Sequence, residues 1–219
     1  VHRYGAPSLD HLKRSKLLSP TELQQTLQVD LRQPATVVAY HPVTLLHDTT
    51  EEADAVFAAL HQIDGQILFC YPNADAGSHN LMQRTRNFIE QHKNAHVFVN
   101  LPAVTYWSLL RHASLLLGNS SSGIMEAASF ALPVVNIGLR QYGRERARNI
   151  LDAEPNTKSI LEKVATARSP AFRESLQGVI NPYGDGHAAE RIVRVLTTTP
   201  LQGLLRKRAP SQFEPVSPK

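Results

Sequence analysis

The chain has 219 residues, of which 42% are hydrophobic and 19% are charged. A chain of this size and composition buries roughly 70% of its unfolded surface, which excludes a disordered polar polymer. The formal net charge of +4 is too small for the concentrated basic stripe that binds nucleic acid. We therefore exclude a nucleic-acid partner and expect a small anionic ligand.

Cysteine content and hydropathy indicate the environment of the chain. Cys70 is the single cysteine, which excludes disulfide frameworks and sites built from several thiolates and favours the reducing cytoplasm. No apolar stretch approaches the length of about 18 residues that spans a bilayer, so we expect no membrane partner. The chain starts at Val1 without Met or a signal sequence, and we expect it to begin within a longer protein.

The first half of the chain predicts an alternation of strands and helices. Ser19 to Glu22 has the pattern of a capping box, with Pro20 at the first helical position. The apolar runs that follow have strand length and do not alternate with polar residues, which is typical of strands covered on both faces. In chain order we predict a strand at 35–40, a helix at 49–62, a strand at 66–71, a helix at 78–91 and a strand at 96–100.

The second half continues the alternation and ends in a tail. We predict a helix around 107–113, a strand at 115–118, a short helix at 124–130, a strand at 133–137 and helices at 157–167 and 186–196. Strands and helices that alternate this often imply βαβ units, hence an α/β fold with an open parallel sheet and right-handed crossovers. Residues 197–219 are rich in proline, and we expect a tail that is partly disordered.

Polar loops follow several predicted strands, at the sheet edge where open parallel sheets bind ligands. The loop 119–123 joins a strand to a helix with small hydroxyl residues and a glycine, so its N–H groups and hydroxyls could bind a phosphate. The same composition is typical of a plain turn with an N-cap, and both interpretations remain open. The phosphate-binding candidates are Ser120, Ser121, Ser122 and Gly123.

Two charged or titratable residues stand beside these loops. Glu126 lies one turn into the predicted helix, where it could reach a pair of ribose hydroxyls or simply favour the helix dipole. His41 follows the first strand and precedes Pro42, which places its imidazole at the carboxyl edge of the sheet. A capping or packing role for His41 is the alternative.

Two further loops offer ligand-binding candidates. Arg140 and Arg144 flank a glycine-containing loop and could neutralise a pyrophosphate, although a solvated arginine is the more general case. Asn73 and Asp75 share a turn-rich loop, in which they either reach a ligand or form Asx turns.

Two other chemistries are excluded. His92 and His96 have i, i+4 spacing but straddle an expected helix end, and no third metal ligand accompanies them. A Ser-His-Asp triad lacks its G-x-S-x-G elbow, and the serine loop lacks the ending of a phosphate-binding P-loop. We therefore expect no metal.

Taken together, these loops resemble the UDP-N-acetylglucosamine 2-epimerase family, and more closely its hydrolysing branch. Six segments that occur in family order carry the resemblance: 5–10, 41–44, 72–78, 118–123, 133–144 and 183–186.

The resemblance implies one lobe of a two-lobed, glycosyltransferase-B-like fold, with a UDP-sugar between the lobes. This chain is similar to the carboxyl lobe, a three-layer Rossmann-like unit that holds most of the UDP in relatives. We thus expect 1–34 to be an inter-lobe helical segment, 35–196 the UDP-binding lobe and 197–219 the tail.

The resemblance also implies a role for individual residues. His41 and Arg140 would meet the pyrophosphate, Ser120 and Ser121 the phosphates, and Glu126 the ribose hydroxyls. Asn73 would lie beside the nucleotide and the backbone around Leu101 against the uracil. His41 is the expected catalytic residue. Asp75, Ser122, Gly123 and Arg144 are secondary candidates.

The implied reaction converts UDP-N-acetylglucosamine and water to N-acetylmannosamine and UDP, for sialic acid biosynthesis and without a cofactor. An amino-terminal lobe would supply catalytic carboxylates, so we expect the 219-residue chain alone to be inactive and the parent enzyme to form a homo-oligomer. A non-hydrolysing epimerase is one alternative. A catalytically inactive nucleotide-binding module is the other.

Overall fold

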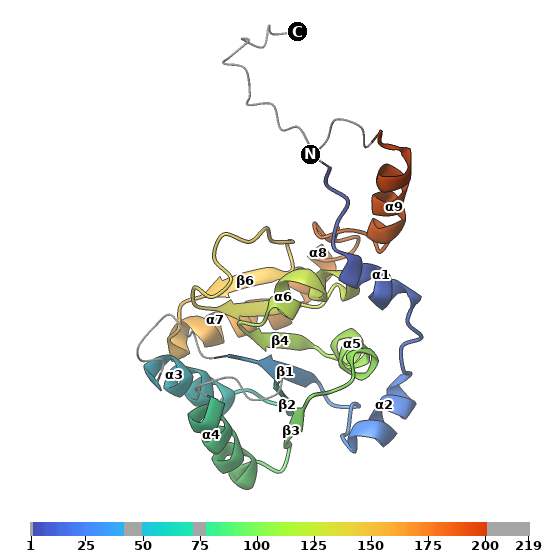
Figure 1. Cartoon of the computed structure of the whole chain (residues 1–219). Coiled ribbons are helices and arrows are strands. Elements are labelled where there is room, and N and C mark those ends of the chain that lie inside the picture. The colour runs from blue at the N-terminus through green and yellow to red at the C-terminus, as the bar shows by residue number, and fades with distance from the viewer. Residues whose placement is uncertain (1, 42–49, 72–77, 201–219) are drawn as a thin grey trace, which may run out of the picture.

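A computed structural model describes residues 2–41, 50–71 and 78–200 of the chain. Its described strands form one six-stranded sheet in the order β3-β2-β1-β4-β5-β6, and all neighbouring strands are parallel (Figure 1). The strands are β1 (Ala35–Ala39), β2 (Gln66–Tyr71), β3 (Ala95–Val99), β4 (Leu115–Gly118), β5 (Val134–Ile137) and β6 (Ile150–Ala153). The predicted α/β class with an open parallel sheet is confirmed.

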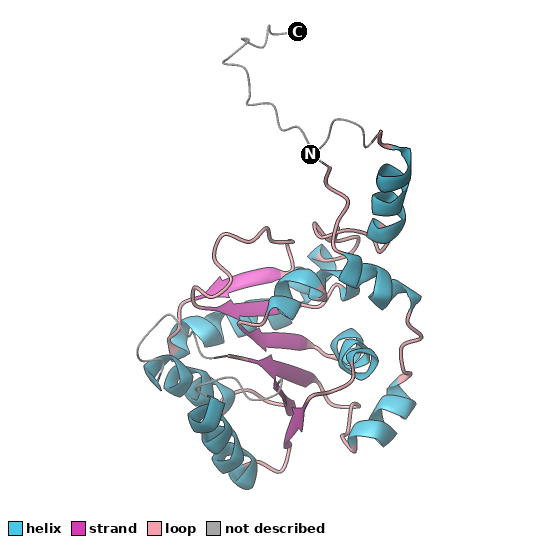
Figure 2. Ribbon diagram, in the orientation of Figure 1, coloured by secondary structure: helices cyan, strands magenta, loops and turns pink. Residues whose placement is uncertain are grey.

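Helices cover both faces of this sheet, which makes three layers (Figure 2). They are α1 (Pro7–Arg14), α2 (Pro20–Leu27), α3 (Thr50–Leu60), α4 (Ser78–Gln91), α5 (Ala103–His112), α6 (Ser121–Met125), the 3-10 helix η1 (Ala127–Phe130), α7 (Thr157–Arg168), α8 (Pro170–Ser175) and α9 (Ala188–Thr198). Helices α3, α4 and α7 pack on one face, while α2, α5 and η1 pack on the other.

Each central strand contributes side chains to both cores. Val38 packs among the side chains of α3, α4 and α7, whereas its neighbour Val37 packs on the opposite face with Leu109 of α5. All five residues of β1 and all six of β2 are buried. This double burial explains why the apolar runs of the sequence predict these strands.

Three elements were not predicted, and one was predicted wrongly. The edge strand β6 was missed because Ile150–Ala153 contains Asp152 and has no apolar run. Helix α1 lies within the segment 1–34 that was expected to be helical, but it was not predicted as a separate helix; it buries Leu9 and Asp10, whereas α8 buries none of its residues. The single helix expected at 124–130 is instead α6 followed by η1, with Glu126 at the junction. The predicted tail begins within α9, and residues 201–219 lie outside the described residues.

The strand order places a topological switch point between β1 and β4. The chain passes from β1 outward to β2 and β3, and then crosses back to β4 on the other side of β1. Helix α3, the next described element after β1, and η1, which follows β4 and α6, pack on opposite faces of the sheet, which opens a crevice at the carboxyl ends of these two strands. This crevice is where the fold predicts a ligand.

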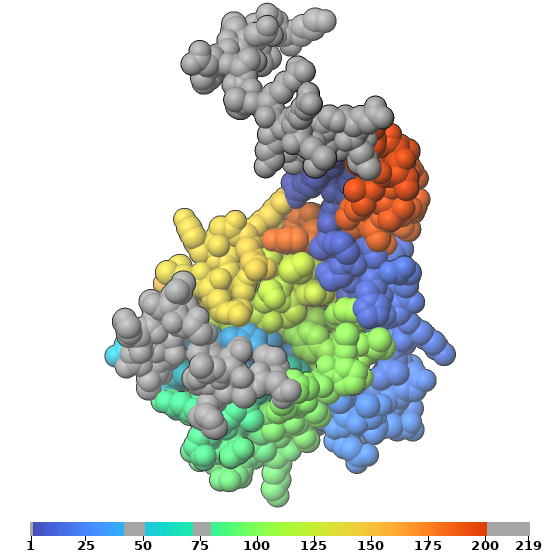
Figure 3. Space-filling model, in the orientation of Figure 1, coloured from blue at the N-terminus to red at the C-terminus, as the bar shows by residue number. Residues whose placement is uncertain are grey.

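The two ends of the described chain are joined through a buried carboxylate. Asp10 of α1 is 4% exposed and accepts hydrogen bonds from the backbone N–H groups of Ala188 (2.9 Å) and Ala189 (2.6 Å) at the start of α9. Burial opposes ionisation of Asp10, but these two hydrogen bonds lower its pKa below the ordinary value. Figure 3 shows the surface of α9 against that of the amino-terminal segment. The N-cap residue of α9, His187, makes no capping hydrogen bond with its side chain, so Asp10 caps this helix from a position more than 170 residues away in the chain.

Candidate functional site

A cavity of about 470 Å³ lies at the switch point. Its polar side chains come from the loops that follow β1, β3, β4 and β5 and from the two ends of α6: His41, Asn100, Ser120, Ser121, Glu126 and Arg140. Its apolar and aromatic side chains come from β2, from β3, from the connection between β3 and α5, and from α5: Cys70, Tyr71, Phe98, Leu101, Tyr106 and Trp107. One wall therefore offers hydrogen bonds and positive charge and the other flat apolar surface, a combination that suits a ring joined to an anionic group.

The structure brings most of the predicted site residues together. His41, Leu101, Ser120, Ser121, Glu126 and Arg140 all line this single cavity. Asn73 and Asp75 lie outside the described residues.

The other three candidates lie elsewhere. Arg144 is exposed and directs Nη1 toward Met125 Sδ (3.9 Å), so it does not belong to the cavity wall. Gly123 is buried below the cavity, where an added Cβ would lie 3.0 Å from the Val134 side chain. Ser122 is buried as well and bonds to other hydroxyls. The geometry therefore does not favour direct contact between a ligand and any of these three residues.

The close approach of β1 and β4 shapes the floor of the cavity. Gly118 ends β4 with φ +141°, and an added Cβ there would lie 2.3 Å from the carbonyl oxygen of Ala39. That same oxygen accepts hydrogen bonds from the N–H groups of Asn119 and Ser120, both at 3.1 Å. A glycine at 118 is required because any side chain would push the two strand ends apart.

Asn119 joins three loops, and sequence reasoning did not single it out as a site residue. Its amide accepts from the N–H of His41 (2.8 Å) and donates to the carbonyl of His41 (2.8 Å). The backbone carbonyl of Asn119 accepts hydrogen bonds from Arg140 Nη1 (3.0 Å) and Gln141 Nε2 (2.8 Å). The residue is 1% exposed, so its own polar groups are shielded from water and depend on these partners. Asn119 therefore positions His41 and Arg140 relative to each other.

Glu126 is a partly buried carboxylate at the junction of α6 and η1. Burial raises its pKa to about 6, although a hydrogen bond from its own backbone N–H opposes this shift. Among the described residues, none of the lysines or arginines forms an ion pair with it. A perturbed carboxyl group in a cavity is typical of a functional site, because packing alone would favour an apolar residue there.

The histidines considered for metal binding are arranged differently from the sequence spacing. His92 lies 3.1 Å from His61 through their ring nitrogens, its Nδ1 faces the carbonyl of Phe88 at 2.8 Å, and its ring stacks on Phe88. His96 lies on β3, where its ring stacks with Phe98 instead. Within residues 2–41, 50–71 and 78–200, no group of three His, Cys, Asp or Glu side chains converges as metal ligands.

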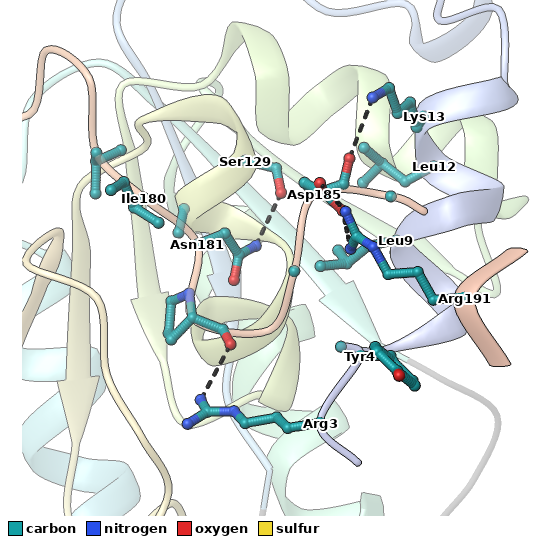
Figure 4. Close-up of a pocket in the computed structure, with 16 residues that line it drawn as sticks. Arg3, Tyr4, Leu9, Leu12, Lys13, Ser129, Ile180, Asn181, Asp185 and Arg191 are labelled. Atoms are coloured by element: carbon teal, nitrogen blue, oxygen red, sulfur yellow. Dashed lines mark hydrogen bonds and ion pairs between the residues drawn. The ribbon is translucent and has the colours of Figure 1, made fainter. Parts of the chain in front are cut away.

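A second cavity, of about 660 Å³, lies between α1, η1 and the segment before α9 (Figure 4). Its charged groups are largely satisfied by one another. Arg191 forms two hydrogen bonds of 2.7 Å with the Asp185 carboxylate, and Lys13 donates to the Asp185 carbonyl at 3.3 Å. It lies away from the carboxyl ends of β1 and β4, so we assign the nucleotide candidate to the first cavity.

Comparison with known proteins decides the family. The family model described as UDP-N-acetylglucosamine 2-epimerase matches residues 1–197. The chain belongs to this family. The resemblance drawn from the sequence is thereby confirmed.

Two curated relatives carry the hydrolysing activity in their names. A UDP-N,N'-diacetylbacillosamine 2-epimerase (hydrolyzing) of Legionella pneumophila is 33% identical over 203 residues, which are 92% of this chain and 52% of that protein. A GDP/UDP-N,N'-diacetylbacillosamine 2-epimerase (hydrolyzing) of Campylobacter jejuni is 33% identical over 161 residues, 71% of this chain and 41% of that protein. This epimerase-family chain therefore spans about half the length of the curated relatives it matches.

A solved structure shares the fold. The UDP-GlcNAc 2-epimerase of Neisseria meningitidis, bound to UDP-GlcNAc, superposes with a TM-score of 0.71 at 17% identity, over 89% of this chain and 54% of that chain. Among the described helices of the present epimerase-family chain, none has the length and apolar character needed to cross a membrane.

Proposed function

We propose that this chain is the UDP-binding lobe of a hydrolysing UDP-N-acetylglucosamine 2-epimerase. The observation that carries the proposal is the convergence of His41, Ser120, Ser121, Glu126 and Arg140 on one cavity at the switch point. In this assignment the diphosphate lies against the serines and the two basic side chains, the ribose hydroxyls meet Glu126, and the uracil lies against the apolar wall near Leu101. The Neisseria relative with UDP-GlcNAc bound supports the choice of ligand.

The proposed reaction has two steps, and this lobe acts on the leaving group. In the first, a base on a second lobe removes the proton from C2 of the sugar while the C1–O bond breaks and UDP departs with the bonding electrons. In the second, water adds to the resulting 2-acetamidoglucal to give N-acetylmannosamine. Departure of UDP builds negative charge on the diphosphate, which Arg140, Ser120 and Ser121 would stabilise. His41 would donate a hydrogen bond or a proton to the same group.

The sugar distinguishes two candidate substrates. UDP-N-acetylglucosamine, leading to sialic acid, is our first choice. UDP-N,N'-diacetylbacillosamine is favoured by the names of the two relatives at 33% identity. Supplying either nucleotide sugar to the enzyme that contains both lobes and identifying the free sugar by mass spectrometry decides between them. A product that retains UDP would instead identify a non-hydrolysing epimerase.

The isolated chain tests the division of labour between the lobes. We expect the 219-residue chain to bind UDP by calorimetry and to release no UDP from UDP-N-acetylglucosamine, because the catalytic carboxylates lie on the other lobe. Turnover by this chain alone would show that the assignment is wrong.

We further propose that the parent enzyme is a homo-oligomer. We also propose a cytoplasmic location, because the single cysteine, Cys70, is a buried thiol rather than part of a disulfide.

The affinity for a UDP-sugar should fall as the pH is lowered through 6, because protonated Glu126 is a poorer acceptor for ribose hydroxyls. Ligand hydroxyls bound to the carboxylate favour its charged form, so binding should return its pKa from about 6 toward the ordinary 4.5. Linkage then gives an affinity about eightfold weaker at pH 5 than at pH 8. Calorimetry with UDP-N-acetylglucosamine measures this, since that ligand lacks the terminal phosphate that titrates near pH 6 in UDP.

Glu126→Gln is the matched control for this pH dependence. The variant should bind more weakly than the wild type at pH 8 and should lack the contribution of Glu126 to the pH dependence. Any pH dependence that remains belongs to the ligand or to the other titratable groups on the cavity, which both proteins share: His41, Cys70, Tyr71, Tyr106 and Arg140. Identical pH profiles for variant and wild type would remove Glu126 from the ribose site.

A further inference from the structure

A chain of three hydroxyl groups runs from the apolar wall of the nucleotide cavity to its phosphate end. Tyr106 Oη, on α5, lies 2.7 Å from Ser122 Oγ, and the Ser122 hydroxyl donates to Ser120 Oγ at 3.1 Å. The backbone N–H of Ser122 also donates to Ser120 Oγ, at 3.4 Å. Tyr106 and Ser120 both line the cavity, whereas Ser122 is buried beneath it.

These contacts determine which way each hydrogen points. A serine hydroxyl has one hydrogen to donate and two lone pairs that accept. The Ser122 hydroxyl already donates its one hydrogen to Ser120 Oγ. In the contact between Tyr106 and Ser122, the Tyr106 hydroxyl is therefore the donor and Ser122 Oγ the acceptor. Because Ser120 Oγ already accepts two hydrogen bonds, its own hydrogen is left to point elsewhere. The bonds therefore run in one direction, from Tyr106 through Ser122 to Ser120.

We propose that Tyr106 is a positioning residue that acts through Ser122. It orients the Ser120 hydroxyl so that this hydroxyl donates its hydrogen to a phosphate oxygen of the bound nucleotide. The inference rests on the proposed function, because it deepens the role assigned there to Ser120. Hydrogen bonds in a chain polarise one another, so the donor at its end is strengthened toward an anion. The same orientation disfavours a ligand group that itself needs an acceptor at this position.

The environment of Tyr106 suits the start of such a chain. Burial raises the pKa of its hydroxyl above the ordinary value of 10, so it remains protonated and able to donate throughout the usual pH range. The rigid ring on α5 fixes the hydroxyl, which a solvated serine or threonine would not.

Removing the tyrosine hydroxyl should weaken the binding of the diphosphate but not of the nucleoside. For Tyr106→Phe we expect UDP affinity to fall about fivefold by calorimetry, with uridine binding by NMR titration within about twofold of the wild type. In a Ser120→Ala background, the change Tyr106→Phe should have almost no further effect on UDP affinity, because the chain acts only through Ser120.

Controls separate this inference from a general loss of packing. Tyr142→Phe removes a hydroxyl from a side chain that is 82% exposed and should leave UDP affinity unchanged. Ser122→Ala breaks the same chain at its middle and should reproduce the loss on UDP, which provides the test if Tyr106→Phe does not fold.

The outcomes distinguish failure of the inference from failure of the proposed function. If the wild type binds UDP and Arg140→Ala weakens it, but Tyr106→Phe or Ser122→Ala does not, the inference alone is overturned. The inference is equally overturned if the Tyr106→Phe effect persists in full in the Ser120→Ala background, or if uridine loses as much affinity as UDP. Failure of the wild type to bind UDP overturns both.

Discussion

Asn119→Ala should lower the free energy of unfolding by about 3 kcal/mol and weaken UDP binding at least tenfold. The wild-type side chain is 1% exposed and pairs with both the N–H and the carbonyl of His41 at 2.8 Å. Alanine removes both of these hydrogen bonds, and each contributes about 1.5 kcal/mol at the upper end of the usual range. His41 would also lose its fixed position relative to the loop after β4. Urea denaturation and calorimetry with UDP measure the two effects.

The companion variants make this result specific. Asn87 is an exposed asparagine on α4 that bonds to Gln83, and Asn87→Ala should change stability by less than about 0.5 kcal/mol. Asn119→Asp retains the shape but places a carboxylate oxygen against the His41 carbonyl, so it should be at least as damaging as alanine. An Asn119→Ala protein as stable as the wild type would contradict the bridging role.

Arg140→Ala should weaken UDP binding by about 1.5–3 kcal/mol, roughly 10- to 150-fold, which is the range for a hydrogen bond to a charged group. Arg140 is exposed on its loop, and its guanidinium is held beside the cavity by the carbonyl of Asn119 at 3.0 Å. Because this is the one hydrogen bond of the Arg140 side chain to the part of the chain that the structure describes, the free energy of unfolding should change by less than about 1 kcal/mol. Calorimetric titration with UDP measures the affinity directly.

Arg144→Ala is the matched control for Arg140. Both arginines occupy the loop after β5 and both are exposed, but Arg144 contacts Met125 rather than the cavity. We expect Arg144→Ala to bind UDP as the wild type does. Equal losses for the two variants would indicate a general electrostatic attraction instead of a contact made by Arg140, and an unchanged affinity for Arg140→Ala would remove that residue from the site.

The central strands were predictable because a strand that is buried on both faces consists of consecutive apolar residues. β1, β2 and β4 are covered on both faces, so they appear in the sequence as uninterrupted apolar runs. The edge strand β6 exposes Asp152, which accepts a hydrogen bond from Asn136 of β5 at 2.7 Å. Pairing with a neighbouring strand, and not apolar composition, makes this segment a strand, so local patterns gave no signal for it.

The predicted helix at 124–130 was wrong for a reason that is also not local. The chain must return to β5 directly after Phe130, and it does so through Ala131 in the left-handed conformation, whose N–H closes on the carbonyl of Ala128 at 3.1 Å. The α-helix begins at Ser121, three residues before the predicted start, and ends at Glu126, after which the chain continues as η1. The break leaves Glu126 on the cavity wall.

The sequence by itself determined the α/β class, the positions of the buried strands and the polar loops at their carboxyl ends, because these features depend on composition over a few neighbouring residues. Only the tertiary structure decided that His41, Glu126 and Arg140 share one cavity while Arg144 does not, since this depends on the strand order and on loop contacts. It also decided the roles of Asn119 and Tyr106. Their partners lie 78 and 16 residues away in the chain, and a hydrogen bond between such residues exists only after the sheet has formed.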